Sequence, residues 1–127
     1  MKKLSTLVAA LLFLGSLSAS ADSLICSYVA RLSARDHRAS DGYPLRDVAA
    51  IIRQDRANFH KFGVRDSEDE SDTFFNSVKN RESLESMLRR RRFNPSIASA
   101  IINGNPLVQV DVMQANEGFI YITLTLL

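Results

Sequence analysis

Asp55 is the residue of this 127-residue chain whose position best suits acid–base chemistry. At about 100° per residue, it falls within an apolar helical stripe formed by Val48, Ile51, Ile52, Phe59 and Phe62. A carboxylate on a core-facing stripe is costly to bury unless it is paired or hydrogen-bonded. It is therefore either a desolvated general acid or base, or a structural carboxylate that pairs with an arginine or caps backbone N–H groups. The structural interpretation is favoured, because arginines are abundant and no nucleophile is matched to Asp55.

The two histidines are the other candidates for catalysis. His60 follows Asp55 by five residues and projects away from it on the helical wheel, and His37 lies in a polar turn. An alternative interpretation of the protein is a small hydrolase that uses Asp55 with one of these histidines. The histidines and the lone Cys26 have no zinc-ligand spacing, and no nucleophile elbow, phosphate-binding loop or dinucleotide fingerprint is present. The sequence predicts no metal site and no cofactor.

The stretch Asp66–Asp72 (DSEDESD) holds five acids in seven residues. Hard oxygen ligands suit calcium, but the glycine and the late glutamate of an EF-hand loop are missing. A solvated acidic loop is the favoured interpretation.

Four consecutive arginines, Arg89, Arg90, Arg91 and Arg92, form a positive collar. They can stabilise a helix C-terminus, face the acidic loop, or bind an anionic partner such as lipid headgroups. We predict that the collar forms a partner-binding surface together with Asp66, Glu68, Asp69 and Glu70, because opposite charges orient a partner.

The N-terminus has the three parts of a secretory signal peptide. Lys2 and Lys3 are followed by an apolar run that is densest from Leu7 to Leu14, and then by the small-residue cleavage signal Ala19-Ser20-Ala21. The apolar run is too short for a membrane span, which needs about 20 residues. We therefore expect residues 1–21 to be cleaved, export across the inner membrane, and a periplasmic or extracellular protein of residues 22–127.

Charge composition argues against a nucleic-acid partner. The chain has 16 basic and 14 acidic residues, and Lys2 and Lys3 account for the excess. The exported part therefore has a net charge of zero, which is not typical of nucleic-acid binding. Its length suits one domain.

The elements that would position these residues follow from periodicity. Residues 24–34 alternate with period two and predict a strand, in which Cys26 would be buried. The sequence then predicts a helix over 45–62 that ends at Gly63, and a short helix that contains Phe74, Phe75 and Val78 and is broken near Lys79. A further helix is expected to begin after the cap Asn94 and to end at a left-handed Gly104.

Two β-rich runs, Leu107–Met113 and Phe119–Leu127, predict a hairpin at the C-terminus. The expected fold is α+β, in the order β-α-α-α-β-β, with a three-stranded, mostly antiparallel sheet and helices on one face. The last strand should be central or covered, since an exposed apolar edge promotes aggregation.

These features favour a small exported binding protein without catalytic activity, such as an inhibitor or immunity protein of a bacterial envelope. The alternatives are the small hydrolase and an envelope protein docked on anionic lipid through Arg89–Arg92. We expect a protein partner in the envelope, with no nucleic acid and no transmembrane span.

Overall fold

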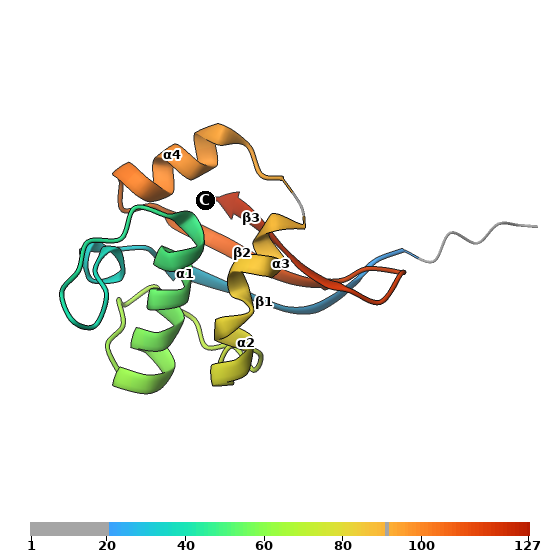
Figure 1. Ribbon diagram of the computed structural model, residues 1–127, viewed down its shortest axis with the longest axis horizontal. Helices are drawn as coiled ribbons and strands as arrows, with labels where there is room; N and C mark the ends of the chain where they lie inside the picture. The colour runs from blue at the N-terminus through green and yellow to red at the C-terminus, as the bar shows by residue number, and fades with distance from the viewer. Residues whose placement is uncertain (1–20, 91) are drawn as a thin grey trace, which may run out of the picture.

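Three strands form one antiparallel sheet in a computed structural model that describes residues 21–90 and 92–127. They are β1 (Ser23–Arg31), β2 (Leu107–Gln114) and β3 (Ile120–Leu126), in the spatial order β1-β2-β3. Four α-helices pack against the sheet, so the α+β prediction is confirmed (Figure 1). The predicted signal peptide, apart from Ala21, lies outside the described residues, as does Arg91.

The alternating pattern places Tyr28 and Ala30 of β1, and Leu32 directly after it, in the core, as period two predicts. The strand ends at Arg31, earlier than predicted, and the chain enters a short 3₁₀ helix, η1 (Ala34–His37). A bulge interrupts the register between Leu24 and Cys26. Cys26, which follows this bulge, packs against the core but is only partly buried, contrary to expectation.

The long helix begins at Val48 rather than at Leu45, because the Asp47 side chain caps it by accepting from the Ala50 N–H. It runs as α1 (Val48–Ala57) and continues as a π-helical turn, η2 (Asn58–Phe62), to a left-handed Gly63. The end of the helix was correctly predicted. The wider π turn shifts the helical phase, so that Phe62 is exposed although it falls on the apolar stripe of an ideal helix.

The middle of the chain forms two short helices, α2 (Val78–Glu82) and α3 (Leu84–Arg89). The break falls at Ser83, later than the predicted bend near Lys79. The prediction that this helix contains Phe74 and Phe75 was wrong, because both precede α2 and Phe75 is buried in the turn before it. The Ser77 side chain, which accepts from the Asn80 N–H, provides the N-cap.

Helix α4 (Pro95–Asn103) begins as predicted, since the Asn94 side chain accepts from the Ser96 N–H and Pro95 occupies the first turn. The prediction of a left-handed Gly104 was wrong: its φ is −131°, an extended conformation. A Cβ at this position would lie 2.9 Å from the Ala100 carbonyl oxygen. Close approach of the backbone, rather than a positive φ, requires glycine here.

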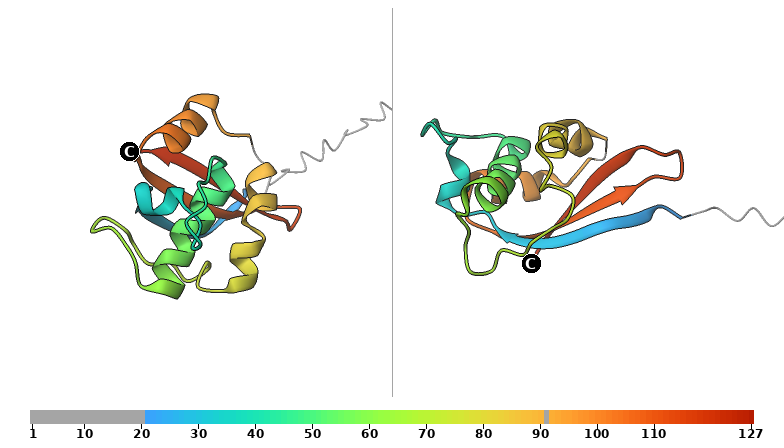
Figure 2. Two further views of the ribbon diagram at one scale, coloured as in Figure 1. Left: turned by 60° about the vertical axis from the view of Figure 1, so that its left-hand side comes forward. Right: turned by 90° about the horizontal axis from the view of Figure 1, so that it is seen from below.

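The core lies between the helices and one face of the sheet (Figure 2). From the sheet it includes Val108, Val110 and Val112 of β2, which alternate with half-buried residues on the other face. No helix in residues 21–90 and 92–127 has the length and apolar character needed to cross a bilayer.

Strand β3 is an edge strand, but it is covered. In the register with β2, the backbone N–H and C=O groups of Ile122 and Leu124 point away from β2, toward the free edge. These two residues are nevertheless only 1% and 7% exposed. Helices α3 and α4 pack against the strand, and Arg90 donates to the outward-facing Ile120 carbonyl. We expected this strand to be either central or covered. It is an edge strand, and helices α3 and α4 cover it.

Candidate functional site

A fully buried arginine, Arg56, organises the charged part of the interior. Its Nε donates to Asp55 Oδ2 at 2.7 Å, and its Nη1 donates to Asp72 Oδ1 at 2.9 Å and to the Glu70 carbonyl at 3.0 Å. The guanidinium also lies 3.9 Å from the centroid of the Tyr28 ring. Asp55 is thus paired with an arginine, the arrangement that the structural interpretation requires.

The two carboxylates of this network are held differently. Burial raises the pKa of Asp55 well above its usual range, and its Oδ1 has no hydrogen-bond partner within the described residues. Burial acts in the same direction on Asp72, but hydrogen bonds from His60, the Phe75 N–H and Arg56 lower the pKa of Asp72. Asp72 is therefore the stable anion of the pair, and Asp55 is the carboxylate that is poorly compensated.

His60 and Asp55 do not form a catalytic pair. The His60 Nε2 atom lies 2.7 Å from Asp72 Oδ1, and its ring packs edge-on against Phe59. Asp55, His60 and Asp72 do not line the two grooves beside residues 38–46 or the groove between α1, α3 and α4. An acid–base site needs polar groups that converge on a cleft. Asp55 is instead 1% exposed, and its Oδ2 accepts from Arg56.

His37 joins two elements of the fold. Its Nδ1 lies 2.7 Å from the Ser33 carbonyl oxygen, and its Nε2 lies 2.6 Å from the Ile101 carbonyl oxygen. The ring therefore ties η1 to the end of α4, which leaves neither ring nitrogen for a substrate.

Asp36 is a buried acid that the sequence interpretation missed, because it lies in a stretch rich in turn-forming residues. Its Oδ1 accepts from Asn58 Nδ2 at 3.0 Å, and its Oδ2 accepts from the Ser33 N–H at 3.1 Å. Burial raises the pKa of Asp36 to about 6, although both hydrogen bonds favour the anion. The spacing of Ser33 and Asp36, whose carboxylate accepts from the Ser33 N–H as in one half of a capping box, was the signal that could have revealed it.

The raised pKa of Asp36 predicts a pH-dependent contribution to stability. A carboxyl whose pKa is higher in the folded state stabilises the fold at low pH, and that contribution is lost as the pH rises from about 4 to about 6. The melting temperature of the wild type should therefore fall relative to that of Asp36→Asn over this range. Thermal unfolding followed by circular dichroism from pH 4 to pH 7 measures it, and a constant difference would contradict the prediction.

The acidic stretch covers the free edge of β1. The Val29 N–H donates to Glu70 Oε1 at 2.7 Å, the Arg31 N–H donates to Asp69 Oδ1 at 2.8 Å, and the Glu70 N–H donates to the Val29 carbonyl. Glu68 forms an exposed ion pair with Arg31 at 3.3 Å. Asp69 and Glu70, which were predicted to contact a partner, thus hold the loop on the sheet. No three acidic, histidine or cysteine side chains converge as metal ligands anywhere in residues 21–90 and 92–127.

The arginine collar lies at the opposite edge of the sheet. Arg89 pairs with Glu85, Arg90 donates to the Ile120 carbonyl of β3 at 2.7 Å, and Arg92 is exposed. Since β1 and β3 are the two outer strands, the structure does not bring the collar and the acidic loop together into one surface.

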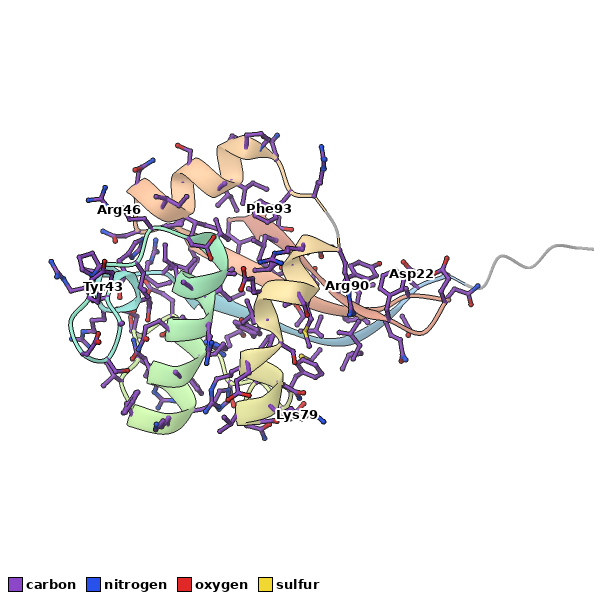
Figure 3. All side chains as sticks on the ribbon, viewed as in Figure 1. Asp22, Tyr43, Arg46, Lys79, Arg90 and Phe93 are labelled. Carbon is purple, nitrogen blue, oxygen red and sulfur yellow. The ribbon has the colours of Figure 1, made fainter. Side chains whose placement is uncertain are left out.

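The most prominent surface feature is a segment that we call the Tyr43 loop, residues 38–46. Tyr43 is 72% exposed, more than any other large apolar side chain in the described chain. The loop closes through an Arg38–Pro44 bridge, and the Ala39 N–H donates to the Tyr43 carbonyl at 2.8 Å. Gly42 supplies the turn with a φ of 89°. Figure 3 shows Tyr43 at the end of the molecule opposite Asp22 and Arg90.

Two grooves flank the Tyr43 loop. One of about 690 Å³ lies between the loop, the outer face of α1 and α2, and it is lined by charges of both signs. The other, of about 580 Å³, lies between the loop, η1 and the turn after α4. Sequence interpretation missed this site, because an isolated tyrosine in a Gly-Tyr-Pro turn has no periodic signal; only its exposure identifies it.

Comparisons of this chain with protein-family models, with curated proteins and with solved structures find no match.

Proposed function

We propose that the protein is exported by means of residues 1–21 and acts in the periplasm as a non-catalytic binding protein, of the inhibitor or immunity type, whose contact surface is the Tyr43 loop. The single observation that carries this proposal is a tyrosine 72% exposed on a loop that is closed by its own hydrogen bonds. Tyrosine is enriched among residues that dominate binding energy, and it offers a large contact area with few rotatable bonds.

The ordering of the loop supports a role in binding. The Leu45 N–H donates to the His37 carbonyl at 2.8 Å, the Gly42 N–H donates to the Ala39 carbonyl at 2.7 Å, and the Tyr43 N–H donates to Asp41 Oδ1 at 3.1 Å. A loop already held in one conformation loses less entropy when a partner binds. The hydrolase alternative has no comparable support, because Asp55 is buried and paired with the equally buried Arg56.

Capture of a partner from the envelope fraction of the host, followed by native mass spectrometry, tests the proposal. Tyr43→Ala should reduce the amount of the captured partner at least tenfold, as expected for a dominant contact residue. Leu24→Ala is the matched control, because Leu24 is also exposed (57%) but lies at the start of β1, two residues after Asp22, which Figure 3 shows far from Tyr43. Equal capture by both variants would exclude the Tyr43 loop as the contact surface.

A further inference from the structure

Among the residues that line the groove between the Tyr43 loop and the turn after α4, those that carry a charge are all basic. Its charged lining residues are Arg38 and Arg46, with His37 beside them, and it contains no acidic side chain. The larger groove on the other side of the loop differs, because three basic residues there face four acidic ones. Although the exported part has no net charge, the charged side chains that line this groove are all basic.

The two arginines retain free hydrogen-bonding capacity. Arg46 is exposed and forms no hydrogen bond or ion pair with the described residues, and Arg38 uses only Nη1, which donates to the Gly42 carbonyl at 3.2 Å. The collar differs, since Arg89 and Arg90 already bind Glu85 and the Ile120 carbonyl. Unpaired guanidinium groups at the wall of a groove favour bidentate binding of carboxylates.

The remaining lining residues favour a polypeptide over a lipid surface. Asn103 and Asn105 carry side-chain amides, which can both donate to and accept from peptide groups. Pro44, Leu45 and Ile102 add apolar surface between the charged groups. A membrane surface would be met by a protruding basic patch, whereas here Tyr43 protrudes and the arginines line a recess.

We infer that this groove binds an acidic segment of the partner polypeptide, with carboxylates on Arg38 and Arg46 and with Tyr43 packed beside them. This inference rests on the proposed function, since it names the chemistry of the partner at the same loop. His37 forms the wall of the groove and is not a ligand, because both of its ring nitrogens already contact carbonyl oxygens.

Titration of the ¹⁵N-labelled protein with hexaglutamate at low ionic strength tests the inference. Amide shifts should concentrate in residues 37–46 and 103–105, and the double variant Arg38→Gln/Arg46→Gln should weaken binding at least tenfold. The matched control is Arg89→Gln/Arg92→Gln, which removes the same charge from the collar and should change the affinity by less than about twofold. Equal losses in both double variants, or no binding at all, would overturn the inference.

Two further probes test whether the groove binds an acidic polypeptide, a free anion or an anionic membrane. If inorganic phosphate binds the groove as tightly as hexaglutamate, the site is one for a free anion and the inference is wrong. If phosphatidylglycerol vesicles bind through Arg38 and Arg46 and displace the peptide, the ligand is a membrane and the inference is also wrong.

The titration needs no partner, so its result is independent of the capture experiment. Loss of capture in Tyr43→Ala without hexaglutamate binding would leave the proposed function standing and reject the acidic ligand. Peptide binding in the groove with undiminished capture by Tyr43→Ala would reject the proposed contact surface instead.

Discussion

Replacement of Arg56 by methionine is expected to lower the free energy of unfolding by about 3–5 kcal/mol, the cost of leaving buried carboxylates without their partner. Arg56 is fully buried and pairs with both Asp55 and Asp72. Asp55 can become protonated at modest cost, because burial already raises its pKa, whereas Asp72 is held as an anion. Urea denaturation at pH 7, followed by circular dichroism, measures the loss.

Arg53→Met is the matched control for this prediction, because Arg53 lies on the exposed side of the same helix. Its free energy of unfolding should change by no more than about 0.5 kcal/mol. If Arg56→Met costs less than about 1 kcal/mol, the buried network does not hold the fold together.

Replacement of Asp72 by asparagine should lower the free energy of unfolding by about 3 kcal/mol, in the range expected for a broken buried ion pair. Its Oδ1 accepts from Arg56 and from His60 at 2.7 Å, and its Oδ2 accepts from the Phe74 N–H at 2.9 Å and from the Phe75 N–H. Every contact brings a donor, so either orientation of the amide would turn an NH₂ group toward other N–H groups. The same denaturation experiment measures this loss.

Asp66→Asn tests whether the effect belongs to Asp72 or to charge in the acidic stretch. The Asp66 side chain forms no hydrogen bond or ion pair within the described residues, so this variant removes the same charge without a buried contact. A comparable loss in both variants would show that the charge of the stretch, and not the network, sets stability.

The buried network also explains why the acidic stretch is ordered. Arg56 donates to the Glu70 carbonyl, and Asp72 closes the turn before Phe75. Beside the first of these anchors, Asp69 and Glu70 cover the edge of β1. Variants of the network should therefore affect stability, whereas variants of the Tyr43 loop should affect binding, so the two sets of predictions can be separated.

Local patterns determined much of this fold. Period two in β1, the Asn94-Pro95 start of α4 and the Gly63 stop after Phe62 all depend on residues that lie next to one another in the chain. Backbone sterics and end-capping act over a few residues, so these signals can be read without knowledge of the fold. The prediction that Asp55 is buried and paired also rests on a local pattern, its position on the apolar stripe of a helix.

Long-range packing decided the rest. The sequence could not identify which arginine pairs with Asp55, because adjacent residues of a helix point in different directions. Only the tertiary structure shows that Arg56 is buried, with its guanidinium against the rings of Tyr28 and Phe59. Nor could it show that Asp69 and Glu70 bind the backbone of β1, because such contacts join residues about 40 positions apart.

The surfaces were the least predictable part. The sequence by itself identified the two charged clusters, but their separation follows from the strand order, which places β1 and β3 at opposite edges. Tyr43 and the basic groove became visible only in three dimensions, because exposure and the convergence of Arg38, Arg46 and Asn105 depend on how η1, the Tyr43 loop and the end of α4 pack together. Local sequence sets conformation over one or two turns, whereas a binding surface is a property of how separate segments are juxtaposed.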